Sequence, residues 1–150
     1  MRRASPTDIE VVKTISADAF LPYEATIGIV PGPAVEDYRP RIARGEVWLL
    51  EDGDDAIGVV VLEERPRHVA IYSIAVRPKC QRSGYGRALL AFAEERARAI
   101  GVGEVRLYTN QRMERNIAIY ERWGFVHTGT RPHPTRTGHV MVDMAKRIAP

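Results

Sequence analysis

Residues 77–87 hold the grouping of side chains and glycines in this 150-residue sequence that points most directly to chemistry. The basic residues and glycines of this segment are, in order, Arg77, Lys79, Arg82, Gly84, Gly86 and Arg87. Glycines let a backbone approach a ligand closely, and the first N–H groups of a helix have no partner within the helix. If a helix begins at Gly84, these N–H groups and the helix dipole form a site for a phosphate or pyrophosphate. The alternative is a tight turn between a strand and a helix that binds nothing.

Two well-known phosphate-binding motifs do not fit this turn. A dinucleotide-binding fingerprint needs a third glycine or an alanine three residues after Gly86, where this sequence has Leu89. A P-loop needs Gly-Lys followed by Ser or Thr, which occurs nowhere in the chain. We therefore expect a different class of phosphate-bearing ligand.

The hydrophobic pattern around the turn predicts a strand, a helix and a second strand. An apolar strand at 69–76 precedes the turn, a helix spans 84–100 and ends at Gly101, and a strand follows at 105–108. Such a unit is right-handed and its two strands are parallel. The remaining predicted elements are helices at 6–20, 35–44 (interrupted or kinked near Pro40) and 115–123, strands at 47–50, 57–62, 125–128 and 140–144, and a loop at 21–33. This order predicts an α/β fold, a mixed sheet with helices on its faces.

Length and composition indicate one globular domain, residues 1–150. Hydrophobic residues make up 45% of the chain and charged residues 27%, which is ordinary for a globular protein. The net charge is +3 with both signs interleaved, so no basic stripe for nucleic acid is visible. Neither a signal peptide nor an apolar run of ~20 residues is present, so we expect a cytoplasmic protein without membrane contact. The single cysteine, Cys80, and the histidines have no metal-ligand spacing, and we expect no metal.

Three motifs, taken together, resemble the GNAT superfamily of acetyltransferases. Gln81-x-x-Gly84-x-Gly86 directly follows Ile74-Ala75-Val76-x-Pro78, in the manner of that family's coenzyme A pyrophosphate motif. The second motif is Tyr108-Thr109-Asn110 at a strand end followed by residues 116–125, and the third is the late strand at 140–146. The resemblance covers residues 1 to 146. It implies a mostly antiparallel sheet with one central pair of parallel strands, helices on both faces, and acetyl-CoA as co-substrate.

The resemblance also implies which residues bind the coenzyme. The backbone of the strand end would hydrogen-bond the pantetheine arm, and an N–H near Val76 would stabilise the oxyanion. The residues implied in binding are Ile74, Ala75, Val76, Gln81, Arg82, Ser83, Gly84, Tyr85, Gly86, Arg87, Asn110 and Asn116.

Tyr120 is the candidate general acid. The tyrosine that matches it in GNAT enzymes commonly lies near the coenzyme sulfur, and a reference pKa of ~10 keeps a tyrosine protonated at neutral pH. The alternative for Tyr120 is an aromatic residue that only packs its helix. Asn116 lies four residues earlier on the same helical face. It either contacts the coenzyme arm, as the resemblance implies, or caps the helix.

A general base is not evident from the sequence. Many relatives carry Glu or Asp on the strand just before Ile74, but here those positions are Tyr72 and Ser73. The remaining candidates are Glu24, Glu63, Glu64 and His139, and deprotonation of the amine through water is equally open.

The leading hypothesis is direct transfer of an acetyl group from acetyl-CoA to a primary amine of a small molecule or peptide. A coenzyme A-binding sensor that has lost catalysis and a nucleic-acid-binding module are the alternatives. The loop at 21–33, the second helix and the segment 131–139 would select the acceptor, and Glu24, Glu36 and Asp37 would suit a cationic amine. We also expect a homodimer, because an apolar strand at 140–144 on a sheet edge invites pairing.

Overall fold

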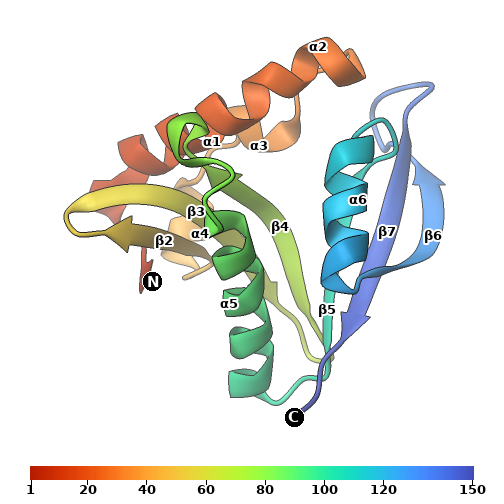
Figure 1. Ribbon diagram of the computed structural model, residues 1–150. Coiled ribbons are helices and arrows are strands. Elements are labelled where there is room, and N and C mark those ends of the chain that lie inside the picture. Colours follow the sequence, from red (N-terminus) through yellow and green to blue (C-terminus); the bar gives the residue numbers. More distant parts are fainter.

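A seven-stranded sheet runs through the protein in a computed structural model that describes residues 1–150 (Figure 1). The strand order is β1-β2-β3-β4-β5-β7-β6, and every neighbouring pair is antiparallel except β4 and β5, which are parallel. The strands are β1 (Arg2–Arg3), β2 (Val47–Asp52), β3 (Asp55–Glu64), β4 (Val69–Val76), β5 (Glu104–Asn110), β6 (Val126–Pro132) and β7 (Val140–Arg147). The predicted mixed, mostly antiparallel sheet with a central parallel pair is confirmed.

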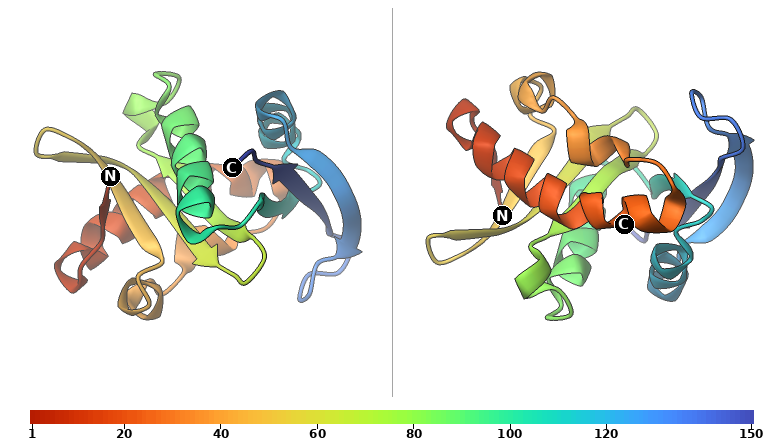
Figure 2. Two further views of the ribbon diagram at one scale, coloured as in Figure 1. Left: turned by 90° about the horizontal axis from the view of Figure 1, so that it is seen from below. Right: turned by 90° about the horizontal axis from the view of Figure 1, so that it is seen from above.

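Helices cover both faces of the sheet, and Figure 2 shows α1 and α5 on opposite sides of it. The helices are α1 (Ile9–Phe20), α2 (Glu24–Ile27), α3 (Gly32–Val35), α4 (Arg39–Ala43), α5 (Tyr85–Ile100) and α6 (Glu114–Trp123). Single 3₁₀ turns are η1 (Pro6–Asp8), η2 (Leu21–Tyr23) and η3 (Pro78–Cys80). None of the helices has the length and apolar character needed to cross a bilayer.

Each face of the sheet has its own hydrophobic core. Leu89, Ala93 and Ala97, spaced four residues apart on α5, are fully buried against the inner strands on one face. Val12 and Ile15 of α1 are fully buried on the other face, together with side chains from α4. The sheet is thus fixed from both sides, and the elements that carry the functional residues have rigid support.

Two expectations for the segment between α1 and β2 were wrong. The predicted loop at 21–33 contains η2, α2 and the start of α3. The predicted helix at 35–44 is shorter than expected, because only α4 lies fully within it and the chain is not helical between the end of α3 at Val35 and the start of α4 at Arg39. Pro40 does not kink a helix but lies in the first turn of α4, where its missing N–H costs nothing. Short helical turns of this kind have no clear hydrophobic period, so tertiary contacts determine where they begin and end.

The place of β7 also differs from the expectation. Residues 140–144 are not at a sheet edge, because β7 lies between β5 and β6 and pairs with both. The edge strand is β6, whose residues are all exposed, including Val126 at 63%. The order arises because β6 and β7 form an antiparallel hairpin and only the second strand of it reaches β5.

The parallel pair β4–β5 is joined over a short length only. The register links Val69, Ala70 and Ile71 of β4 to β5 and then stops, and beyond that point the strands diverge toward their carboxyl ends (Figure 1). At Tyr72 the pairing with β3 shifts by one residue, which is the signature of a β-bulge. From Tyr72 to Val76, β4 therefore presents a backbone edge toward β5 that has no strand partner.

Candidate active site

A groove opens where β4 and β5 diverge, with a cavity volume of about 760 Å³. Its walls come from the carboxyl end of β4, the turn before α5, the first residues of α5, the end of α1 with η2, and one face of α6. Ligands of open α/β sheets bind in such crevices beyond the carboxyl ends of strands. The groove therefore has the position and the size of a ligand site.

The turn between β4 and α5 has the geometry that its sequence predicted. Gly84 has φ +86° and precedes the first residue of α5, and Arg82 has φ +65°. Nothing lies within 4 Å of a Cβ placed on Gly84 or Gly86, so the backbone is open to a ligand there. The side chains of Gln81 and Arg77 hydrogen-bond backbone carbonyls, of Val76 at 3.2 Å and of Ala56 at 2.6 Å respectively. These bonds attach the turn to the strands below it and leave the N–H groups at the start of α5 free.

Positive charge dominates the groove. Arg82 and Arg87 line it from the turn and α5, and Arg115 and Arg122 line it from α6. None of these four arginines pairs with an acidic side chain. Elsewhere in the protein such pairing is common, since 13 of the 14 ion pairs involve Arg or Lys. No Asp or Glu lines the groove. Unpaired guanidinium groups around open helix N–H groups are suited to bind phosphate.

The structure brings together most of the predicted coenzyme residues. The groove is lined by Ile74, Val76, Gln81, Arg82, Gly84, Gly86, Arg87 and Asn116. The other four predicted residues do not line it. Ala75 is buried in the core beneath α1, and Asn110 lines a second cavity. Ser83 is exposed in the turn, and the Tyr85 hydroxyl lies 3.5 Å from the Asp52 carboxylate.

Several groove residues were missed by the sequence analysis. Arg115, Ile119 and Arg122 lie at positions i, i+4 and i+7 of α6 and all face the groove. That spacing is readable in the sequence and would have found them. Tyr23 and Phe20 reach the groove from the chain's first quarter, and no local pattern indicates this long-range placement.

The two helices that flank the groove are held together by a buried glutamate. Glu94 of α5 is 8% exposed and accepts hydrogen bonds from the Trp123 indole of α6 at 2.7 Å and from Lys146 of β7 at 3.1 Å. A buried carboxylate with two such donors is satisfied and therefore stabilises the arrangement. Trp123 itself lines the groove, so this contact sets the distance between α5 and α6.

Tyr120 lies where the groove meets a second, smaller cavity of about 180 Å³. The two cavities share Phe20, Ile74, Asn116 and Tyr120. The Tyr120 ring packs edge-on against Phe125 with centroids 6.0 Å apart. Burial, with a smaller contribution from Tyr23, raises the pKa of Tyr120 to about 12. The hydroxyl stays protonated at any physiological pH, and no protein group hydrogen-bonds it.

Asn116 does not cap its helix. Met113 is at the N-cap of α6, and Asn116 is the third residue of the helix. Its side-chain oxygen accepts a hydrogen bond from the Tyr23 hydroxyl at 3.2 Å. Asn116 therefore connects α6 to the segment after α1 and places an amide at the junction of the two cavities.

The second cavity has mostly apolar walls. Its residues are Phe20, Ile27, Ile29, Val30, Pro31, Gly32, Pro33, Ile71, Tyr72, Ser73, Ile74, Leu107, Tyr108, Thr109, Asn110, Met113, Asn116, Tyr120, His133 and Met141. One wall is the segment from α2 to α3, which is held in place by the Tyr38 hydroxyl donating to the Pro33 carbonyl at 2.5 Å. The other walls are β4, β5, the start of α6, and the β6–β7 hairpin with His133 and Met141. No acidic residue is among them.

The candidate carboxylate bases lie outside this cavity, and Glu63 and Glu64 are held in ion pairs. Glu63 bonds to Arg41 at 2.9 Å and to Arg65 at 3.0 Å. Burial alone would raise the pKa of Glu63, but these hydrogen bonds outweigh it and hold that pKa below its usual value. Glu64 pairs with Arg96 at 2.6 Å, and Glu24 is exposed on α2. None of them is placed to deprotonate an amine beside Tyr120.

The two histidines near the cavity also lack a free basic nitrogen. The backbone N–H of Arg112 donates to the side-chain oxygen of Asn110 at 2.9 Å, and this orients the Asn110 amide. The NH₂ group of Asn110 then donates to Nδ1 of His139 at 3.0 Å. Nδ1 of His133 accepts from the backbone N–H groups of residues 135 and 136. Burial and the nearby charge of Arg112 lower the pKa of His139. In both rings Nδ1 is therefore already occupied by hydrogen bonds.

Comparisons with known proteins identify the family. A model described as the acetyltransferase (GNAT) family matches residues 15–125. An uncharacterized N-acetyltransferase of Bacillus subtilis, YvbK, is 33% identical over 92 residues, which cover 61% of this chain and 57% of that protein. This chain thus spans little more than half of that relative.

Solved structures share the fold. The ribosomal-protein-S18-alanine N-acetyltransferase of Escherichia coli superposes with a TM-score of 0.77 at 21% identity, over 99% of this chain and 92% of that chain. A GNAT acetyltransferase of Elizabethkingia anophelis with acetyl-CoA bound gives a TM-score of 0.65 at 22% identity, over 73% of this chain and 80% of that chain. Since the family model covers most of the residues and includes the turn, the groove and Tyr120, the chain belongs to the GNAT acetyltransferase family.

Proposed function

We propose that the protein transfers the acetyl group of acetyl-CoA directly to a primary amine while both substrates are bound. One observation carries this proposal: an arginine-lined groove and an apolar cavity meet at Ile74, Asn116 and Tyr120. The groove would take the phosphates and pantetheine arm of the coenzyme, and the cavity would take the amine. Two adjoining sites allow a ternary complex, so no acetylated enzyme intermediate is needed.

Each end of the reacting thioester has a suitable group beside it. The unpaired edge of β4 beyond Ile71 offers backbone N–H groups to the pantetheine amides and to the oxyanion. The Tyr120 hydroxyl, free of protein partners, would donate a hydrogen bond to the sulfur as it leaves. Attack of the neutral amine nitrogen forms the C–N bond and the C–S bond breaks. The nitrogen loses a proton to water as the amide forms, and the thiolate, stabilised by the hydrogen bond from Tyr120, takes a proton from water.

The amine would lose its proton to solvent water instead of to a protein side chain. Nδ1 is occupied in both His133 and His139. Glu63 and Glu64 are held in ion pairs, and Glu24 lies outside the cavity. The mouth of the cavity is open to solvent, so water can carry the proton away. This arrangement requires the small neutral fraction of the amine to be the reacting form.

The proposal is tested by binding and by turnover. Isothermal titration calorimetry should show that acetyl-CoA binds far more tightly than NAD or ATP. Arg115→Ala and Arg122→Ala should each weaken acetyl-CoA binding roughly 10-fold or more, the usual range for a charge-assisted hydrogen bond. Arg44→Ala, on the far side of the sheet, is the control. Equal or tighter binding of NAD would refute the coenzyme assignment.

Turnover separates the enzyme from an inactive coenzyme sensor. Thiol release from acetyl-CoA should depend on added amine, and double-reciprocal plots should intersect, as a ternary complex requires. Tight acetyl-CoA binding without acetyl transfer to any amine would instead establish the sensor.

The homodimer also remains a proposal, now supported by a different strand. β6 is fully exposed at the edge of the sheet and has unpaired backbone groups that a second copy could extend. Light scattering at high protein concentration should give the mass of a dimer, and Val126→Pro should shift it toward the monomer. A monomer at every concentration would refute the pairing.

A further inference from the structure

The walls of the second cavity, which we call the acceptor cavity, are suited to hold an apolar group. Of its 20 lining residues, 12 are hydrophobic. Ile71, Leu107 and Met141 line it from the sheet and are each less than 9% exposed. Ile27 and the prolines that flank Gly32 line it from the α2–α3 segment. Engineered cavities of about 150 Å³ with such walls bind benzene, so a volume of about 180 Å³ suits a ring or a short alkyl chain.

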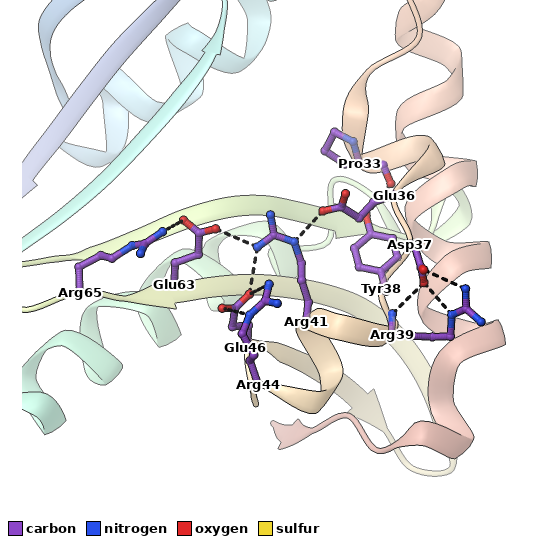
Figure 3. Close-up of polar contacts among 10 residues, drawn as sticks. All are labelled: Pro33, Glu36, Asp37, Tyr38, Arg39, Arg41, Arg44, Glu46, Glu63 and Arg65. Atoms are coloured by element: carbon purple, nitrogen blue, oxygen red, sulfur yellow. Dashed lines mark hydrogen bonds and ion pairs between the residues drawn. The ribbon is translucent and has the colours of Figure 1, made fainter. Parts of the chain in front are cut away.

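The acidic side chains that act electrostatically on the cavity are held in ion pairs, Glu36 with Arg41 and Glu63 with both Arg41 and Arg65. Glu36 and Glu63 influence the Tyr72 and Tyr108 hydroxyls at the cavity, yet both carboxylates bond to Arg41, at 2.6 and 2.9 Å (Figure 3). The Arg41 guanidinium also lies 3.8 Å from the centroid of the Tyr72 ring. A cationic acceptor would therefore find these carboxylates already paired and the Tyr72 ring already in contact with a cation.

The free charge beside the cavity is positive. Arg112 donates to the backbone carbonyl of Ile27, a wall residue, at 2.9 Å and has no carboxylate partner. Its charge is one cause of the lowered pKa of His139. A second ammonium group on the acceptor would be repelled here and would find no acidic side chain to pair with.

We propose that the acceptor is a primary amine on an uncharged, apolar chain or ring, and that diamines and polyamines are poor substrates. This rests on the proposed acetyl transfer. In this proposal the cavity holds the apolar part of the acceptor, and only the reacting nitrogen reaches Tyr120. The acidic residues Glu24, Glu36 and Asp37, which suggested a cationic acceptor from the sequence, do not line the cavity.

An isosteric pair of amines gives the sharpest test. Heptylamine and 1,6-diaminohexane have the same chain length and differ only in a terminal methyl or ammonium group. With acetyl-CoA saturating, kcat/KM should be at least about 10-fold higher for heptylamine, since one methylene in an apolar pocket is already worth that factor. Calorimetry of the two amines with the coenzyme A complex should show the same preference without turnover.

A negative charge placed in the cavity wall should remove the preference for heptylamine. Val30 lines the cavity and is partly exposed, so Val30→Asp adds a carboxylate there without burying it fully. The heptylamine preference should fall at least 10-fold in this variant. Val35→Asp is the matched control, because Val35 is 70% exposed and lies outside the cavity, and its preference should equal that of the unmodified protein.

The outcomes distinguish a failure of the apolar-acceptor proposal from a failure of the proposed acetyl transfer. Equal or higher kcat/KM for the diamine would overturn the apolar acceptor while leaving acetyl transfer intact. Tight acetyl-CoA binding with no acetylation of heptylamine would also overturn it. Failure of acetyl-CoA to bind at all would instead remove the proposed function on which it rests.

Discussion

Replacing Tyr120 by phenylalanine tests the catalytic assignment with little structural disturbance. The ring packs against Phe125, and that packing survives the change. The hydroxyl has no protein partner, so no buried group is left unpaired when it is removed. We therefore expect the free energy of unfolding to change by less than about 0.5 kcal/mol, and acetyl-CoA affinity to change little.

The size of the rate effect follows from the pKa of Tyr120. That pKa is raised to about 12, well above the ~8.5 of a comparable thiol. Complete proton transfer from Tyr120 to the thiolate would be uphill by roughly 5 kcal/mol. The hydroxyl is therefore better suited to stabilise the leaving thiolate through a hydrogen bond than to give up its proton fully. A hydrogen bond to a charged group contributes about 1.5–3 kcal/mol, so kcat should fall by roughly 10- to 150-fold.

Steady-state thiol release with heptylamine measures this effect, and calorimetry and thermal unfolding provide the controls. A fall in kcat with intact binding and stability would support the hydrogen-bond role. Unchanged kcat on a confirmed amine would mean that the thiolate leaves unaided, and Tyr120 would then have no catalytic role. Joint loss of stability and binding would identify Tyr120 as a structural residue.

Three further predictions follow from the same geometry. Gly84→Val should weaken acetyl-CoA binding more than 10-fold by calorimetry, whereas Gly101→Val, with similar backbone strain at φ +79° at the other end of α5, should leave it unchanged. For heptylamine, kcat/KM should rise about tenfold per pH unit from about pH 7 to 10, toward the amine's pKa of ~10.4, and a plateau within this range would show that a protein side chain accepts the proton. Hydrogen bonds from Arg2 hold the pKa of Asp8 well below its ordinary value, although burial alone would raise it. Asp8→Asn should therefore lower the free energy of unfolding by about 1–2 kcal/mol above pH 4. That cost should shrink as the pH falls toward the lowered pKa, and a cost that stays constant down to pH 2 would contradict the ion pair.

Local signals in the sequence were sufficient for much of the fold. The Ser5–Asp8 capping box is present, with the Ser5 N–H donating to the Asp8 carboxylate at 2.7 Å. Gly101 and Gly124 end α5 and α6 in the left-handed conformation, as a glycine after an apolar helix predicts. The turn at Gly84 was also predictable, because strand, glycines and helix are adjacent in the chain. These features depend on neighbours within a few residues.

Features that depend on distant contacts were not predictable. The insertion of β7 between β5 and β6 requires pairing of Glu104 with Arg147, far apart in the chain. The ion pair between Arg41 and Glu63 likewise joins α4 to the end of β3, 22 residues further along the chain (Figure 3). Sequence patterns describe one element at a time, so Glu63 appeared as a candidate base when its neighbours in space make it an ion-pair partner.

The opening between β4 and β5 explains why the two cavities meet beside Ile74. Pairing that continued past Ile71 would satisfy the β4 backbone and leave no edge for a ligand. The bulge at Tyr72 shifts the strand's alternation by one residue, so that Ala75 faces the α1 core while Ile74 lines both cavities. The α6 helix follows β5 on the far side of this opening, and Tyr120 on it faces Ile74 across the junction of the two cavities. A straight, fully paired β4 would close the junction, and a longer gap would separate the thioester from the amine. The short parallel pairing is therefore the feature of the fold on which the proposed chemistry depends most.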